Sequence, residues 1–143
     1  MAGLKYEKYI VTEAKPALKL PEYRRKSVEA PPDMRTPLLF LDNEVIKGAF
    51  YVEVVWYWKG SDTFRVEAHT HDFDEVIGFF GTDPRDTKAL NGEIELWLGD
   101  EKYLLTKSCL VFVPRGLKHC PLMIHRVDRP IFHFTAGPSA IYR

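Results

Sequence analysis

From Gly48 onward the chain alternates between short apolar segments and clusters of turn residues. Glu93–Leu98 shows the pattern most clearly, because its odd and even positions differ sharply in polarity. Such alternation is typical of a strand with one covered face. The same reasoning predicts eight strands: Ala49–Lys59, Thr63–His71, Glu75–Phe80, Glu93–Leu98, Lys102–Leu105, Leu110–Val113, Cys120–His125 and Ile131–Thr135. Many short strands with frequent turns predict an all-β sandwich or barrel.

The segments between these strands predict how the strands pair. Gly99 and Asp100 form a two-residue turn, which makes the flanking segments a hairpin. The polar segment Thr82–Asn91 contains a proline and is expected to be a loop. The turn Val127–Pro130 predicts a second hairpin between the last two strands. Trp56 and Trp58 share one face of their strand, and we expect them in the core.

Residues 1–47 have a different character from residues 48–143. Five prolines interrupt this first part, so a long helix is not possible there: Pro16, Pro21, Pro31, Pro32 and Pro37. We interpret 1–47 as an extended proline-rich arm that packs on the barrel or on a partner subunit, and 48–143 as the barrel itself. The arm and the aromatic strands together predict a homodimer.

Charge and cysteine content limit the classes of partner. The chain has 20 basic and 20 acidic side chains and therefore no net charge, which argues against binding of nucleic acid. No apolar run approaches the ~20 residues that cross a bilayer, so no membrane partner is predicted. Cys109 and Cys120 form no C-x-x-C pair and indicate no disulfide framework. A cytoplasmic location is the simplest expectation.

One short segment concentrates groups that bind transition metals. His69, His71 and Glu75 are separated by even spacings, and side chains two apart on a strand point the same way. His119 follows a Pro-x-Gly turn 44 residues after Glu75. Three imidazoles and a carboxylate suit one divalent ion among Fe, Mn, Zn, Ni, Co and Cu. The alternative is that these are surface histidines at a strand end.

The two ligand segments resemble the paired motifs of the cupin superfamily. His69-Thr70-His71 followed by Glu75 matches the centre of the first cupin motif, and Pro114 to His119 matches the centre of the second. The resemblance covers roughly residues 48–135 and departs at turn positions, where Ser108 and Met123 replace an expected glycine and asparagine. It implies a small single-domain cupin: a double-stranded β-helix, or jelly-roll, barrel. It also implies that His69, His71, Glu75 and His119 are the metal ligands.

Strand parity predicts what surrounds such a metal. Counting from His119 places Pro121, Met123 and His125 on its side and turns Cys120 outward; the last hairpin would set Met123 opposite His133. Counting from the first motif turns Arg65, Glu67, Ile77 and Phe79 inward. His133 and His125 are therefore candidate acid–base residues, and satisfied structural histidines are the alternative for both. A small-molecule ligand is the expected partner.

Two functions remain open at this point. By resemblance, a cupin with this ligand set is an enzyme acting on a small organic molecule, with dioxygenase-like oxidoreductase or decarboxylase/isomerase-like chemistry. The other interpretation is a non-catalytic small-ligand-binding or sensor cupin with a structural metal. Fold alone does not decide between them.

Overall fold

The computed structural model describes residues 3–13 and 31–138 of the 143-residue chain. One 3₁₀ turn, η1 (Glu7–Tyr9), precedes eight strands. The strands are β1 (Arg35–Leu41), β2 (Tyr51–Tyr57), β3 (Glu75–Phe80), β4 (Ala89–Leu98), β5 (Glu101–Lys107), β6 (Cys109–Val113), β7 (His119–Val127) and β8 (Ile131–Gly137). The predicted strand Glu75–Phe80 is confirmed to the residue.

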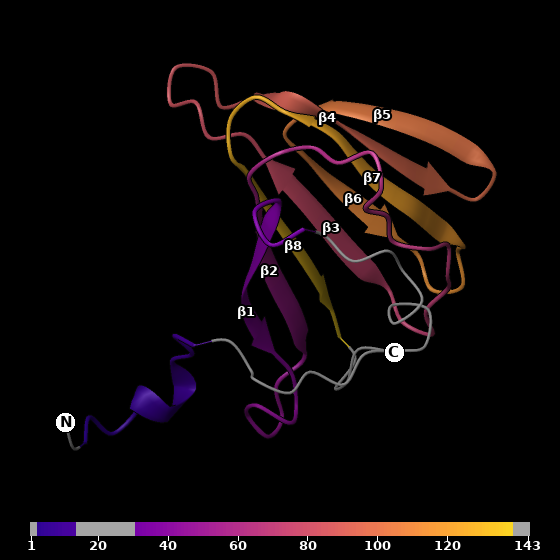
Figure 1. Cartoon of the computed structure of the whole chain (residues 1–143). Helices are drawn as coiled ribbons and strands as arrows, with labels where there is room; N and C mark the ends of the chain where they lie inside the picture. The colour runs from indigo at the N-terminus through magenta and orange to yellow at the C-terminus, as the bar shows by residue number, and fades with distance from the viewer. Residues whose placement is uncertain (1–2, 14–30, 139–143) are drawn as a thin grey trace.

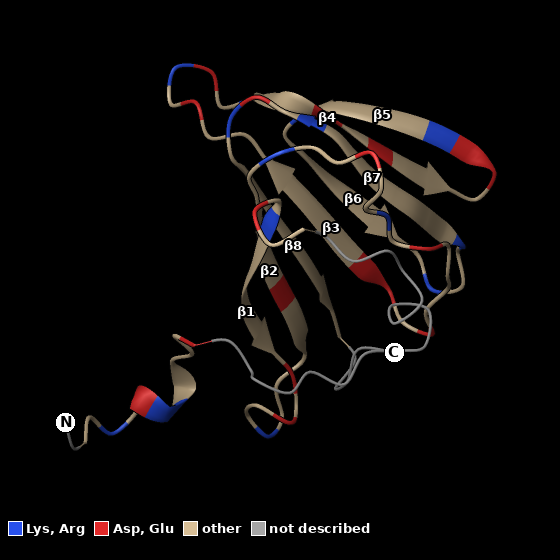
Figure 2. Ribbon diagram, in the orientation of Figure 1, with Lys and Arg blue, Asp and Glu red and all other residues tan. Residues whose placement is uncertain are grey.

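The strands form two antiparallel sheets that face each other (Figure 1). The larger has the order β1-β2-β8-β3-β6, and the smaller has the order β5-β4-β7. Alternation on the strands turns apolar residues toward the space between the sheets, where the larger of two buried clusters includes Val55, Ile77, Phe79, Ile94, Leu96, Ile124 and Ile131. Charged residues gather in the turns and at strand ends (Figure 2). The predicted all-β, two-sheet architecture is confirmed.

The last two strands do not form the predicted hairpin. β7 pairs with β4 in the smaller sheet, whereas β8 pairs with β2 and β3 in the larger one. The connecting turn therefore carries the chain from one sheet to the other, which a turn sequence alone does not reveal. His133 lies opposite Val55 and Phe79 rather than Met123.

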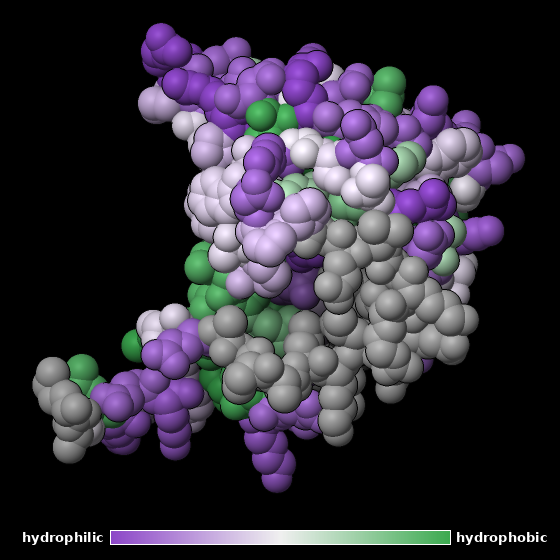
Figure 3. All heavy atoms as spheres, in the orientation of Figure 1, coloured by the Kyte–Doolittle hydropathy of each residue, from purple (hydrophilic) through white to green (hydrophobic). Residues whose placement is uncertain are grey.

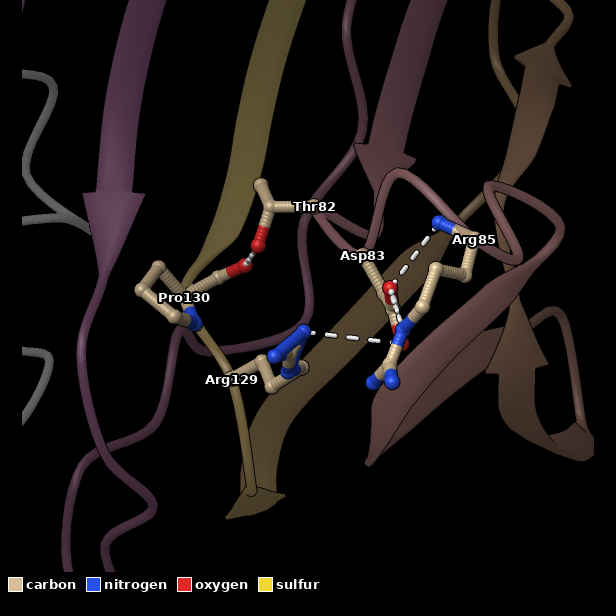
Figure 4. Close-up of polar contacts among 5 residues, drawn as sticks. All are labelled: Thr82, Asp83, Arg85, Arg129 and Pro130. Atoms are coloured by element: carbon tan, nitrogen blue, oxygen red, sulfur yellow. Dashed lines mark hydrogen bonds and ion pairs between the residues drawn. The ribbon is translucent and has the colours of Figure 1, made fainter.

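Side chains near this crossing tie it to the segment after β3 (Figure 4). The Thr82 hydroxyl donates a hydrogen bond of 2.7 Å to the Pro130 carbonyl. Asp83 accepts a hydrogen bond from Arg85 Nε at 3.2 Å and lies 3.5 Å from Arg129. The hydrogen bonds from Arg85 and the charge of Arg129 hold the pKa of Asp83 below its ordinary value. The two connections are thus fixed to each other at one end of the barrel.

The predicted strand Thr63–His71 is only partly formed. Its residues pair with β7 through two isolated bridges, Val66 with Leu122 and His69 with His119. The two bridges are three positions apart on each segment, an odd number, so the face that points inward changes between them. Phe64 and Val66 are buried, while Arg65 and Glu67 are half-exposed and paired with each other at 3.1 Å. The prediction that Arg65 and Glu67 point inward is wrong for this reason.

β7 breaks the parity rule as well. Its pairing with β4 shifts twice, and each shift leaves one extra residue on β7, as in a β-bulge. Leu122 and Ile124 are therefore buried, and Cys120, which has a φ of 72°, is buried too. The predicted outward position of Cys120 is wrong. Ile77 and Phe79, on the regular strand β3, point inward as predicted.

Part of the predicted arm lies within the larger sheet. Arg35–Leu41 forms its edge strand β1 and pairs with β2. η1 is drawn apart from the sheets and buries none of its residues (Figure 1). Residues 14–30 of the arm lie outside the described residues, so the boundary at 47 and the docking of the arm stay predictions. In the part of the chain that the structure describes, no helix has the length and apolarity needed to cross a membrane.

Trp56 and Trp58 lie on the outer face of the larger sheet rather than in the core. Their rings stack with centroids 5.3 Å apart, and Trp58 is 41% exposed. Val55 and Tyr57 take the inward positions of the same strand. Apolar surface gathers over β1 and β2 in the space-filling view (Figure 3).

Candidate metal centre

Three histidines converge where the end of the first motif meets the start of β7. His69 and His119 exchange two backbone hydrogen bonds of 3.0 Å each, so the two residues lie directly opposite each other. Their ring centroids are 4.3 Å apart, and the His71 ring lies 4.7 and 5.1 Å from the other two. The candidate ligand atoms of the three side chains all lie within 4.8 Å of one another.

Backbone carbonyls fix the ring orientation of two of these histidines. His69 Nδ1–H donates to the Glu67 carbonyl at 2.7 Å, and His119 Nδ1–H donates to the Leu117 carbonyl at 3.0 Å. A carbonyl only accepts, so the proton of each neutral ring is assigned to Nδ1 and the lone pair to Nε2. His119 Nε2 is buried and makes no hydrogen bond with a described residue. This is the arrangement in which a metal-ligating histidine is usually held, so the three histidines could hold a metal ion.

Glu75 is the carboxylate nearest to this group. It is 3% exposed, and its two oxygens lie 3.3 Å from His119 Nε2 and 3.7 Å from His71 Nε2. Burying a carboxylate is costly unless a cation or hydrogen-bond donors compensate its charge. A divalent ion among the imidazoles would supply that compensation.

The tight turn before His119 is hydrogen-bonded to the segment that carries His71. Gly116 N–H donates to the His71 carbonyl at 3.0 Å, and Arg115 N–H donates to Asp74 Oδ1 at 2.8 Å. Gly116 has a φ of +84°, a conformation that side chains disfavour. The Pro-x-Gly sequence before His119 thus shapes a turn that holds the first segment in register with the second.

His69 and His119 line a narrow cavity between the sheets. Fourteen residues line it: Arg35, Tyr51, Glu53, Tyr57, Val66, His69, Glu75, Ile77, Leu96, His119, Cys120, Leu122, His133 and Thr135. The cavity volume is about 30 Å³, which is enough for about two water molecules. In this form the cavity accommodates only a small ligand.

The two candidate acid–base histidines lie in different places. His133 lines the cavity, donates from Nδ1 to the Gly78 carbonyl at 2.9 Å and stacks on Phe79 with centroids 4.5 Å apart. His125 lies outside the cavity, because it is the extra residue of a bulge in β7, and its Nε2 lies 2.9 Å from Glu95 Oε1. The parity argument that placed His125 beside His119 is therefore wrong.

Sequence reasoning missed several polar residues of the cavity, among them Arg35, Tyr51 and Glu53. Tyr51 makes a short contact with Thr135, and Glu53 lies opposite Thr135 across β2 and β8. Glu53 had a signal, because it is the one charged residue inside the apolar run from 49 to 58. Arg35 had none, because it lies in the predicted arm.

The two cysteines differ in their surroundings. Among the described residues, neither forms a disulfide bond. Burial raises the pKa of the Cys109 thiol, which favours the protonated form that binds metals poorly. Cys120 lines the cavity beside His119.

Comparison with known proteins supports the fold at low sequence identity. No protein-family model matches the sequence, and no curated protein matches it. An oxalate oxidase structure is similar with a TM-score of 0.51 and 14% identity, covering 85% of this chain and 60% of that one. This chain therefore spans about 60% of the length of that protein. The likeness, the two facing sheets and the paired motifs agree. The chain has the cupin fold.

Two further solved structures are similar at lower scores. One is an RmlC-like cupin from Shewanella frigidimarina, with a TM-score of 0.48 and 16% identity over 80% of this chain and 86% of that one. The other is KdgF from Halomonas sp., with a TM-score of 0.47 and 17% identity over 78% of this chain and 86% of that one. The similarity to the oxalate oxidase structure, at a TM-score of 0.51, confirms the sequence-based resemblance to cupins at the level of the fold.

Proposed function

We propose that this cupin-fold protein is a metal-dependent enzyme that acts on a small organic molecule at a centre of His69, His71, His119 and Glu75. The observation that carries the proposal is the inward convergence of the histidines, two of them with Nδ1 committed to a backbone carbonyl. A bound transition metal would supply Lewis-acid chemistry, or redox chemistry if it is iron, copper or manganese.

The side chains around the centre have separable tasks in this proposal. Glu75 balances the positive charge of the ion and fixes its position from β3. His133 lines the cavity, is anchored through Nδ1 to Gly78 and is the candidate acid–base residue there. Val66, Ile77 and Leu122 line the walls with apolar groups and limit the entry of water. Dioxygenase-like, decarboxylase-like and isomerase-like reactions are all compatible with this set.

Metal content measured on untagged protein tests the ligand assignment. We expect about one equivalent of a transition metal in the unaltered protein, and a loss of nearly all of it in His71→Ala and His119→Ala. His125→Ala is the matched control, because His125 is a histidine on β7 outside the cavity. Equal metal content in all four proteins, or none after reconstitution, would contradict the proposal.

A second measurement separates an enzyme from a binding module with a structural metal. A catalytic centre keeps a coordination position open, whereas a structural centre is closed. Azide added to Co²⁺-loaded protein should therefore change its visible absorption spectrum. An unchanged spectrum would instead support the non-catalytic interpretation.

A further inference from the structure

Arg35 brings a positive charge to the cavity of the candidate metal centre. It begins β1, lies opposite Tyr57 and lines the cavity together with His69, Glu75 and His119. Its guanidinium carbon is 5.7 Å from the centre of the Tyr57 ring and 5.4 Å from that of Phe64. Two aromatic rings thus hold the guanidinium in place by cation–π contact.

The guanidinium has no anionic partner among the described residues. Arg35 Nε is buried without a hydrogen bond. Four other arginines of the described chain have a carboxylate within ion-pair distance: Arg65 with Glu67, Arg85 and Arg129 with Asp83, and Arg126 with Asp128. A buried donor without a partner is destabilising. A position that keeps such a donor is therefore suited to a partner supplied by a ligand.

Glu53 is the acidic side chain of the cavity that is not part of the metal group. No ion pair forms between it and Arg35 in the described structure, although both line the same space. Their positions on the sheet explain this, because Arg35 pairs with Tyr57 and Glu53 lies four residues earlier on β2. That offset is about 13 Å along a strand. Glu53 thus leaves the fork of Arg35 available and can itself accept a hydrogen bond from a ligand.

We propose that the cavity binds a small organic acid and that Arg35 holds its carboxylate. The planar fork of a guanidinium matches a carboxylate through two parallel hydrogen bonds. The apolar walls at Val66, Ile77 and Leu122 cover the carbon skeleton. The inference names the substrate class of the proposed enzyme and in that sense rests on the proposed function, but Arg35 binds the acid whether or not a metal is present.

Binding of acetate and of its neutral isostere acetamide tests this assignment. Ligand-observed NMR titrations are carried out on metal-free and Zn²⁺-loaded protein, after the zinc content of each sample has been measured. We expect acetate to bind with at least tenfold higher affinity than acetamide. In Arg35→Gln the affinity for acetate should fall about tenfold, and that for acetamide should not change. Zn²⁺ loading should strengthen acetate binding, because it offsets the charges of Glu53 and Glu75.

Two further variants keep the result interpretable. Arg126→Gln is the matched control, since Arg126 is exposed and paired with Asp128 at 2.9 Å outside the cavity, and it should bind acetate like the unaltered protein. Arg35→Lys keeps the charge but not the planar fork, so its affinity for acetate should fall about threefold. This variant provides the test if Arg35→Gln does not fold.

The outcomes separate this inference from the proposed function. Acetate affinity that is the same in Arg35→Gln, or acetate binding that depends only on zinc, would overturn the role of Arg35. Absence of acetate binding in every sample would overturn it as well. Protein that takes up no zinc but binds acetate through Arg35 would contradict the proposed metal centre and support the anion site.

Discussion

The two faces of the five-stranded sheet differ in where their charged side chains lie. The outward rows contain no charged residue: Val52, Ala136, Val76 and Phe112; Val54, Phe134, Gly78 and Leu110; and Trp56, Phe132 and Phe80. The inward rows contain Glu53, Glu75 and His133 among apolar neighbours. Polar side chains are usually found outside and apolar ones inside. The inner face combines the buried core with a few polar groups that can act chemically, whereas the uncharged outer face is suited to being covered.

The inner face also differs from the outer one in how tightly it is packed. Phe79 is 0% exposed, whereas Phe112 on the neighbouring strand β6 is 59% exposed. The same residue type thus occurs once in the core and once on the surface of a single sheet. Substitutions at these two positions compare the faces directly.

The largest expected effect is on stability, from truncation at the inner face. Phe79→Ala should lower the free energy of unfolding by about 3–5 kcal/mol, because it removes a buried ring and leaves a cavity. Phe112→Ala should change it by less than about 0.5 kcal/mol in the monomer. Chemical denaturation followed by circular dichroism measures both. Similar losses at the two positions would mean that the outer face is also buried in solution.

The next prediction concerns the oligomeric state of the protein. The sequence predicts a homodimer, and we expect a second copy of the chain to cover the outer face. Phe112→Glu would place a charge in that contact and should convert a dimer to a monomer, observed by sedimentation equilibrium. Lys107→Glu, at an exposed end of β5 in the other sheet, should leave the mass unchanged. A monomeric unaltered protein would show that the homodimer prediction is wrong.

The smallest expected effect is on the pH dependence of stability. It concerns the outer face of the three-stranded sheet, where, unlike on the outer face of the larger sheet, two titratable side chains, Glu95 and His125, are paired. Burial alone would raise the pKa of Glu95, but hydrogen bonds from His125 and Trp97 outweigh it and hold that pKa below 4.5. A depressed carboxylate pKa stabilises the fold above the unfolded-state value, and this contribution is lost as the pH falls through the folded-state value.

Between pH 6 and pH 3 we therefore expect the unaltered protein to lose about 1 kcal/mol more stability than Glu95→Gln does. The estimate is small because the His125 side chain is 35% exposed and solvent screens the pair. Thermal unfolding across this pH range measures the difference. Parallel pH profiles for the two proteins would show that the pair contributes nothing.

Most strand positions and the convergence of three histidines that could hold a metal ion were predictable from the sequence, and the lining of the cavity was predictable only in part. β3 is regular, so counting from Glu75 placed Ile77 and Phe79 correctly. β7 contains two bulges, and a bulge leaves no mark in the alternation of polar and apolar residues that parity counting uses. His125 was misplaced for that reason.

Long-range pairing was the other limit. The turn after β7 has the composition of a hairpin turn, yet it joins two different sheets. Arg35 reaches the cavity only because β1 pairs with β2, a contact between segments that share no local pattern. Both facts depend on which strands become neighbours, and local sequence does not determine that.

The reciprocal hydrogen bonds between His69 and His119 have a kinetic consequence. Each residue donates its amide proton to the carbonyl of the other at 3.0 Å, so neither proton can exchange with solvent unless the same bridge opens. The two amides should therefore share one opening rate, although they lie 50 positions apart in the chain. Their exchange with deuterium would report how often the two halves of the centre separate.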